Sequence, residues 1–476
     1  MNQTSTITII LILAANPGSA DDSLKEAVVA SIDEQSGALI SMSNQIWAHA
    51  EVALDETESA KVLVDYAEQQ GFRVERGVAG MPTAFIASYG EGSPVVGILG
   101  EYDALPGLSQ NASPVKGARV EGAAGHGCGH NLFGVGSLGA ATAVKRLMES
   151  GALQGTLRYY GTPAEEAVGG KIYMAREGLF DDLDIALSWH PNSENEMDTS
   201  SSQAMVETVV DFSGEAAHAA YDPWNGRSAL DGLELFTHAL NMLREHVRPT
   251  VRIHYAILKG GDAPNVVPEK ARAGVWIRDS EMAGVLPLYE RMQVMADGAA
   301  MAANVEADVR LISGTYNTLI NNEAAKIVHA NMERLGDIEF SESENDFAKQ
   351  LQKAMGVPEV GLNGKIQPLV LNSTEASGGS TDVADVSWIV PTVDLEVATA
   401  PVDIPWHSWG VVAASGSPMG HRGMQYAAKV LATTMIDLYV DPELLGPIRE
   451  EFEKSTKGFI YKAYIPPGPP PVPARD

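Results

Sequence analysis

The chain has 476 residues, of which 45% are hydrophobic and 20% charged, a composition typical of a globular protein that can bury large cores. Its formal net charge of −29 argues against nucleic acids and anionic membrane surfaces as partners, because long-range repulsion opposes polyanions. The length exceeds what one core normally supports, so two domains are expected, and the single cysteine excludes an intramolecular disulfide.

An apolar run at residues 7–15 has the length of a signal-peptide core and is followed by small residues before Asp21. Residues 1–6 contain no Lys or Arg, which signal peptides normally have. Two expectations therefore remain. Residues 1–20 are either the signal peptide of an exported, periplasmic or extracellular, protein or a short buried strand of a cytoplasmic one. The run is too short to span a membrane.

The next part of the chain combines helical periodicity with short apolar strands. Apolar residues at helical spacing predict helices over residues 22–50, 57–70 and 132–147. Alternating or continuous apolar residues predict strands over residues 72–76, 83–89, 95–99, 156–160, 184–189 and 392–398. This pattern predicts an α/β catalytic domain with a central mixed sheet flanked by helices.

The pattern changes at about residue 203. Strands are predicted over residues 206–212, 251–257, 271–277 and 305–312, with helices over residues 230–245 and 285–304. Strand, helix, strand, strand, helix, strand is the order of a ferredoxin-like fold. We therefore expect residues 203–316 to be an inserted α+β lid, and residues 21–202 and 317–476 to form one discontinuous domain. Exposed strand edges in such an insert predict a homodimer.

Residues typical of metal sites follow several predicted strands, where ligands bind in α/β sheets. The only cysteine lies in a glycine-rich turn, residues 125–131, at the start of a predicted helix. The candidate metal ligands are Cys128, His130, Glu166, His190 and His407.

Each candidate has an ordinary explanation when taken alone. A lone Cys is usually a small buried hydrophobe. His190 could be satisfied by the backbone at a strand end, and His407 could be a surface histidine stacked on tryptophan. The glycines beside Cys128 remove its apolar packing, however, and the start of a helix is expected to lower the pKa of its thiol. The joint occurrence of the five candidate ligands, most of them just after predicted strands, favours a metal centre.

Two adjacent divalent cations can share a water, lower its pKa and produce a nucleophile for a polarised carbonyl. Glu165, beside the ligand Glu166, is then the candidate general base, although it could instead support a histidine. The oxyanion needs a donor outside the metals, and His218 is the candidate. Asn265 and Arg278 are candidate substrate contacts, Arg278 as a clamp for a carboxylate. Ordinary turn chemistry could also explain these three residues.

Seven segments, in this order along the chain, resemble a known family: 101–107, 127–131, 161–166, 189–191, 260–268, 379–388 and 405–409. The family is that of the dinuclear metal amidohydrolases of the aminoacylase and carboxypeptidase superfamily. The branch that these segments resemble most is the group formed by the B subunits of aminobenzoyl-glutamate hydrolases.

The resemblance implies two Mn or Zn ions per subunit and cleavage of the amide between an acyl group, expected to be aromatic, and an amino acid, as in aminobenzoyl-glutamate. It implies the same five metal ligands, with Glu165 as general base. It also implies that His218 reaches the active site of a partner subunit, and that Asn265 and Arg278 contact substrate. A homologous second subunit type is a further expectation.

Two positions depart from the carboxypeptidase relatives, which have a histidine in place of Glu101 and a bridging aspartate in place of Cys128. The indole-acetyl amino acid hydrolases are similar in having the cysteine. Alternative functions are an indole-acetyl-aspartate-type hydrolase, a dipeptidase, or a non-enzymatic metal- or ligand-binding protein that retains the fold. The weak dinucleotide-binding match at residues 134–139 lies inside a predicted helix without a preceding strand, so helix packing explains it better.

Overall fold

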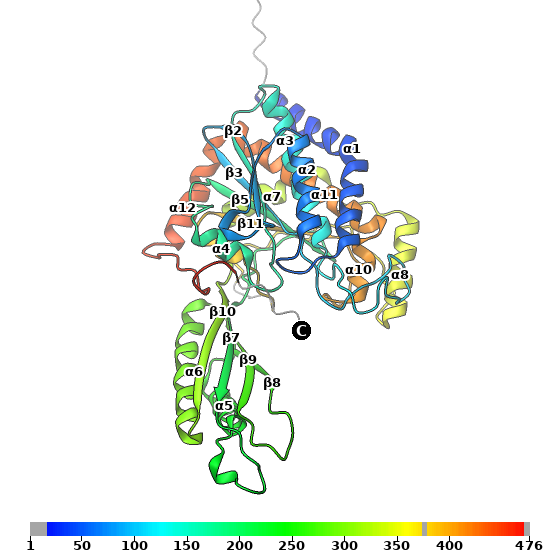
Figure 1. Cartoon of the computed structure of the whole chain (residues 1–476). Coiled ribbons are helices and arrows are strands. Elements are labelled where there is room, and N and C mark those ends of the chain that lie inside the picture. Colours follow the sequence, from blue (N-terminus) through cyan, green and yellow to red (C-terminus); the bar gives the residue numbers. More distant parts are fainter. Residues whose placement is uncertain (1–16, 374–377, 471–476) are drawn as a thin grey trace, which may run out of the picture.

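The computed structural model describes residues 17–373 and 378–470, which form a large layered unit and a smaller projecting one (Figure 1). Most of the segment expected to be a signal peptide, residues 1–16, lies outside the described residues, and helix α1 (Pro17–His49) begins directly after it. Among the described helices, none is both long and apolar enough to cross a membrane.

The large unit is built on a seven-stranded mixed sheet with the order β1-β2-β4-β3-β5-β11-β6. Its four central strands, β4, β3, β5 and β11, are parallel, and β1, β2 and β6 pair antiparallel at the edges. The strands are β1 (Arg73–Arg76), β2 (Phe85–Glu91), β3 (Val95–Gly100), β4 (Gly155–Gly161), β5 (Ile185–Asn192), β6 (Glu196–Met197) and β11 (Thr392–Ala398). The predicted α/β class with a central mixed sheet is confirmed.

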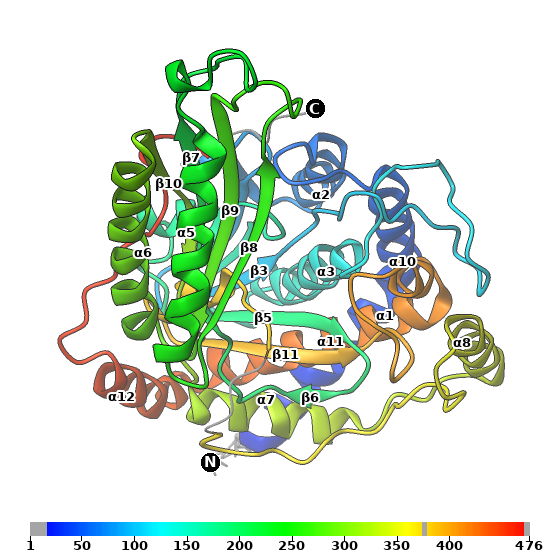
Figure 2. The ribbon, with the colours of Figure 1, turned by 90° about the horizontal axis from the view of Figure 1, so that it is seen from below.

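Helices cover both faces of this sheet (Figure 2). The main hydrophobic core lies under α1, α2 (Thr57–Gln69), α3 (His130–Glu149), α7 (Asn322–Leu335) and α11 (Pro418–Val440). A second cluster lies under α4 (Gly170–Arg176) and α9 (Val383–Ser387). The remaining helices are α8 (Glu342–Met355), α10 (Trp409–Ser415) and α12 (Leu445–Ser455). Short 3₁₀ helices span Val78–Gly80, Pro223–Asn225, Arg244–His246 and Pro442–Leu444.

The glycines of residues 134–139 serve helix packing. A Cβ atom on Gly136 would lie 2.9 Å from the ring of Trp189, and one on Gly139 would lie 2.9 Å from Leu39. Both glycines lie in the interior of α3, so the run lets this central helix approach β5 and α1 closely. These contacts explain the fingerprint-like run without a dinucleotide.

The projecting unit has its own hydrophobic core and a four-stranded antiparallel sheet. Its elements are β7 (Ala204–Ser213), α5 (Ala229–Leu243), β8 (Arg252–Lys259), β9 (Lys270–Asp279), α6 (Met282–Ala303) and β10 (Glu306–Thr315). The spatial order β10-β7-β9-β8 is that of the predicted ferredoxin-like fold. Both helices pack on the sheet and on each other, and β8 is an edge strand with mostly exposed side chains.

Candidate active site

The polar residues that follow the parallel strands meet at one edge of the large sheet, because the carboxyl ends of these strands all point there. They line a pocket of about 340 Å³ between the large unit and the start of the projecting unit. Cys128, Glu165, Glu166, His190 and His407 all contribute to its wall. Four of the five predicted ligands and the predicted base therefore share this pocket, and the fifth, His130, lies directly behind the wall.

The glycine-rich turn brings Cys128 against β5. Gly129 has a left-handed φ of 78°, and a Cβ atom there would lie 2.9 Å from the side chain of Pro191. A Cβ atom on Gly125 would lie 2.5 Å from the carbonyl oxygen of Leu108. A larger residue at Gly129 would push the turn away from β5, and one at Gly125 would push it away from the loop that contains Leu108. Gly129 thus lets the cysteine approach the histidine at the end of β5.

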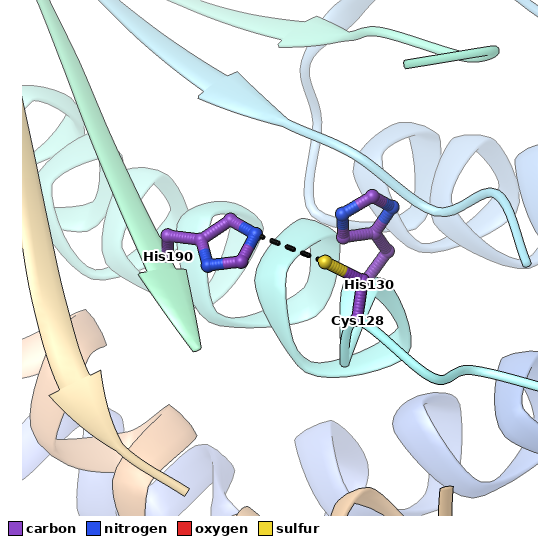
Figure 3. Close-up of side chains that lie close together, drawn as sticks. All are labelled: Cys128, His130 and His190. Atoms are coloured by element: carbon purple, nitrogen blue, oxygen red, sulfur yellow. Dashed lines mark hydrogen bonds between the residues drawn. The ribbon is translucent and has the colours of Figure 1, made fainter. Parts of the chain in front are cut away.

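The predicted ligands form two groups that share one atom. The ligand atoms of Cys128, His130 and His190 lie within 4.8 Å of one another, and so do those of Cys128, Glu166 and His407. The thiol sulfur is 3.4 Å from Nε2 of His190 (Figure 3). On the other side, Nε2 of His407 is 3.6 Å from Oε2 of Glu166. The sulfur of Cys128 therefore stands where it can bridge two adjacent cations.

Hydrogen bonds orient both imidazole rings toward this centre. Nδ1 of His190 donates to the carbonyl oxygen of Pro191 at 2.8 Å, which leaves Nε2 with its lone pair facing the sulfur. Nδ1 of His130 is 2.9 Å from Oδ1 of Asp103. The other oxygen of Asp103 accepts the backbone N–H of Glu166 at 2.9 Å. Asp103 thereby fixes one ligand of each group.

The charges of the pocket suit divalent cations. Burial, with the neighbouring Glu166, raises the pKa of the Cys128 thiol, so the lowering expected from the helix start was wrong. Burial also raises the pKa of Glu166 to about 7, and its Oε1 atom is buried without a hydrogen-bond partner. Burial lowers the pKa of His190 to about 4, which keeps it neutral and able to coordinate. Bound cations would supply the missing positive charge. Coordination to a cation would also deprotonate the thiol of Cys128.

Two non-glycine residues at the site have left-handed backbone conformations, Ala164 with φ 63° and His407 with φ 54°. Such residues cost about 1–3 kcal/mol each and persist where surrounding contacts hold them. The N–H of Ala164 donates to Oε1 of Glu56 at 2.9 Å, and that of His407 donates to the carbonyl oxygen of Gly127 at 3.1 Å. These bonds hold Glu165, which follows Ala164, and His407 at fixed positions on the pocket wall.

A buried ion-pair network around Lys171 adjoins the pocket, and reasoning from the sequence assigned no role to Lys171, Glu101 or Asp382. Lys171 in α4 is fully buried and donates to Glu101 and, at 2.7 Å, to Oδ1 of Asp382. The second oxygen of Glu101 lies 3.0 Å from Nε2 of His130 without hydrogen-bond alignment. The sequence offered one signal for this network, because Glu101 stands where the carboxypeptidase relatives have a histidine. Nothing in the short segment around Lys171 marks it as a partner.

The residues predicted to contact substrate lie in two different parts of the structure. Arg278, near the end of β9, lines the pocket, donates to Oγ of Ser380 at 3.3 Å and has no acidic partner in the described part of the chain. His218 and Asn265 are exposed and lie in the β7–α5 and β8–β9 loops, at the far end of the projecting unit (Figure 1). The loops contact each other, since the N–H of Ala219 donates to the carbonyl oxygen of Asn265 at 3.1 Å. Neither residue is among the described residues that line the pocket of its own chain.

The chain is similar over most of its length to known hydrolases. The family model described as Peptidase family M20/M25/M40 matches residues 97–367. The B subunit of the p-aminobenzoyl-glutamate hydrolase of Escherichia coli (strain K12) is 37% identical over 91% of this chain and 96% of its own length. The Xaa-Arg dipeptidase of Homo sapiens is 31% identical over 92% of this chain and 94% of its own length.

Two solved structures share the fold at low sequence identity. The aminobenzoyl-glutamate utilization protein of Klebsiella pneumoniae has a TM-score of 0.57 at 16% identity, covering 86% of this chain and 97% of its own. A Bacillus subtilis protein, described as a dinuclear metal-binding peptidase of family M20, has a TM-score of 0.55 at 17% identity, covering 85% and 99%. At these identities the likeness establishes the fold alone.

Proposed function

Since the chain belongs to Peptidase family M20/M25/M40 and is a hydrolase of amide or peptide bonds, we propose that it cleaves N-acyl amino acids with two divalent metal ions. One observation carries the metal proposal: the two groups of candidate ligands share the sulfur of Cys128. Glu165 lies beside them in the same pocket. When bound, the two ions would lower the pKa of water and polarise the scissile carbonyl group.

The protein's own residues would move the proton. Glu165 would take a proton from the attacking water and deliver it to the nitrogen of the leaving amino acid. Burial, with the charge of Glu101 next, raises the pKa of Glu165 well above the usual value for a glutamate. A raised pKa suits a carboxylate that must accept and then release a proton near neutral pH.

The projecting unit would bind the other parts of the substrate. Arg278, unpaired with any described acid, would hold the substrate carboxylate. His218 and Asn265 lie far from their own pocket, so we propose that they complete the active site of a second copy, with His218 as the oxyanion donor. The exposed edge strand β8 offers a surface for pairing the two copies. A homologous second subunit type, as the name of the E. coli relative suggests, is the competing assembly.

Aminobenzoyl-glutamate is the first substrate to test, on the strength of the E. coli relative. An indole-acetyl-aspartate conjugate is the second, since a hydrolase named for that substrate from Enterobacter agglomerans is 25% identical over 59% of this chain. Dipeptides are the third, because the human relative is named as a dipeptidase. Thiolate and imidazole ligands favour Zn, whereas the carboxylate ligand also suits Mn.

The test is the release of free amino acid from these three substrates by purified protein loaded with Zn or with Mn. The proposal predicts turnover with at least one metal and its loss after chelation. Turnover that persists without any divalent metal would contradict the proposed chemistry. Metal binding without hydrolysis of any of these amides would exclude all three substrate classes.

A further inference from the structure

A second cavity adjoins the pocket of the candidate active site. It has a volume of about 300 Å³ and lies between the large unit and the sheet of the projecting unit. Both cavities have Glu165, Glu166, His407 and Arg278 in their walls. The predicted base and two predicted ligands therefore stand where the cavities meet. A substrate whose amide lies at this point can extend one group into each cavity.

One wall of the second cavity is the face of the projecting sheet that its helices do not cover. Val275 and Ile277 of β9 lie in the hydrophobic core under these helices, so Trp276 lies on the opposite face. Met205 of β7 and Leu105 of the large unit also line the cavity. Among the described residues of its wall, Trp276 is the one with a six-membered aromatic ring.

Two contacts fix the orientation of the Trp276 ring. Glu207 lies in register with Trp276 on the neighbouring strand and accepts a hydrogen bond from its indole N–H. The guanidinium carbon of Arg278 lies 5.1 Å from the centroid of the ring, within the range of a cation–π contact. The residue two positions before Trp276, on the same face of β9, is Gly274. Arg278 therefore covers one side of the ring, and no side chain of β9 covers the other.

The same contact leaves Arg278 able to bind an anion. Because the indole ring offers no oxygen acceptor, the cation–π contact does not use up the N–H donors of the guanidinium group. Arg278 donates to Oγ of Ser380 at 3.3 Å and has no acidic partner in the described part of the chain. Neighbouring side chains of β9 can therefore hold a carboxylate and an aromatic ring of one substrate.

Packing inside the projecting unit does not account for Trp276. Its two helices, α5 and α6, pack on the other face of the sheet. Trp276 is partly exposed and faces the second cavity. A partly exposed aromatic ring beside a catalytic pocket is a suitable surface for a planar apolar group.

We propose that Trp276 stacks on an aromatic ring of the acyl group and thereby selects aromatic over aliphatic acyl amino acids. This inference rests on the proposed amidohydrolase function, in which Arg278 holds the carboxylate of the amino acid. The ring then belongs to the other side of the amide, as it does in aminobenzoyl-glutamate and in indole-acetyl-aspartate. Trp276 determines specificity and takes no part in the transfer of protons.

One pair of amides tests this contact. N-benzoyl-glutamate and N-cyclohexanecarbonyl-glutamate carry six-membered rings of similar size, but only the benzoyl ring is planar and aromatic. Trp276→Leu should lower the ratio of their kcat/KM values, benzoyl over cyclohexanecarbonyl, by about two- to tenfold relative to the wild-type protein, the effect of one aromatic pair. Trp276→Phe retains a ring and should keep most of the wild-type ratio.

A second variant keeps the test valid if Trp276→Leu does not fold. Gly274→Val retains Trp276 but places a side chain beside the open side of its ring. A Cβ atom at this position would meet Leu258 at 3.6 Å, an ordinary contact, so the strand has room for it. This variant should lower the same ratio. Tyr289→Leu in α6 is the matched control and should not change it, since Tyr289 is outside the described walls of both cavities.

A second pair of amides places the ring on the released amino acid. N-pentanoyl-phenylalanine and N-pentanoyl-cyclohexylalanine differ in the same way as the first pair, but on the other side of the amide. Trp276→Leu should leave the ratio of their kcat/KM values at the wild-type level. A fall in this second ratio would overturn the assignment of the second cavity to the acyl group.

The test separates this inference from the proposed function. Turnover of the first pair at a ratio that neither Trp276→Leu nor Gly274→Val changes would overturn the inference and leave the amidohydrolase function standing. If no amide is hydrolysed, calorimetry on the same metal-loaded protein gives the ratio of the dissociation constants. Tighter binding of N-benzoyl-glutamate, lost in Trp276→Leu, would support the aromatic site although the proposed catalysis had failed. A binding ratio that the substitution leaves unchanged would overturn it.

Discussion

The sulfur of Cys128 lies 3.4 Å from Nε2 of His190, although 62 positions of chain separate the two residues. The glycine-rich turn before α3 supplies the thiol, and the end of β5 supplies the imidazole. This approach places the sulfur between two sets of nitrogen and oxygen donors. It is the geometric basis for the proposed bridged pair of metal ions.

Replacing Cys128 by alanine should cost the protein both ions, because this sulfur belongs to both ligand groups. His407→Ala should weaken only the group that contains Glu166. Metal content per subunit after dialysis, measured by mass spectrometry, distinguishes the two results. His218→Ala, far from the centre, is the control and should keep the wild-type metal content. Equal metal loss in the Cys128 and His407 variants would argue against a bridging sulfur.

Glu165→Gln should lower kcat by about 10²- to 10⁴-fold, the usual contribution of a general acid–base residue. Since Glu165 is not assigned as a ligand, the metal content should stay at the wild-type level. Initial rates and metal analysis on the same preparation test both parts. Unchanged turnover would rule out Glu165 as the base, and a simultaneous loss of metal would make it a ligand.

We expect His218 of one subunit to act in the active site of the other subunit of a dimer. Neither Glu165→Gln nor His218→Ala should be active alone, but unfolding and refolding an equimolar mixture should restore roughly one quarter of the wild-type rate. Half of the dimers are then hybrids, and each hybrid has one intact site. Dimer formation is checked by light scattering. A mixture as inactive as its components would contradict a shared site.

Lys171→Met should destabilise the fold by about 3–5 kcal/mol, since Glu101 and Asp382 would be left buried without their cation. Denaturant unfolding of the metal-free protein measures the effect without interference from activity. Lys61→Met removes an exposed lysine that pairs with Asp65 and should leave the unfolding midpoint almost unchanged. Similar midpoints for the two variants would show that the buried network contributes little.

The metal-free protein should lose stability as pH rises from about 5 to 8. Burial raises the pKa of Glu56 from 4.5 to about 8, with Asp103 next, and burial raises that of Asp385 from 3.8 to about 8. Between the unfolded and folded values the native state holds more protons, so the free energy of unfolding falls as pH increases. Thermal melts across this range test the slope. Glu56→Gln should flatten it, and a slope of opposite sign would contradict the assigned burial.

The periodicity of the sequence predicted the sheet and its flanking helices. The sequence also predicted that the candidate ligands lie close together, because parallel strands place the residues that follow them at one edge of the sheet. Lys171 could not be assigned, since a lysine in a short helix usually faces solvent and only the tertiary structure shows its two buried acids. The pKa of Cys128 was mispredicted for a related reason. The helix start favours a thiolate, but burial outweighs it, and burial is not visible in a seven-residue motif.

The polar face of β11 illustrates another limit. The alternation of Asp394 and Glu396 with apolar residues is visible in the sequence and predicts a strand with one polar face. A polar face normally faces water. Only the fold shows that this one turns toward a pocket, beside His190.

The anomalous-scattering map of crystals grown with Zn or Mn tests the central claim most directly. We predict two peaks about 3.5–4 Å apart, the usual spacing of a two-metal site, with the sulfur of Cys128 between them. One ion should be bound by His130 and His190, and the other by Glu166 and His407. A single peak, or peaks away from Cys128, would contradict the bridged dinuclear centre.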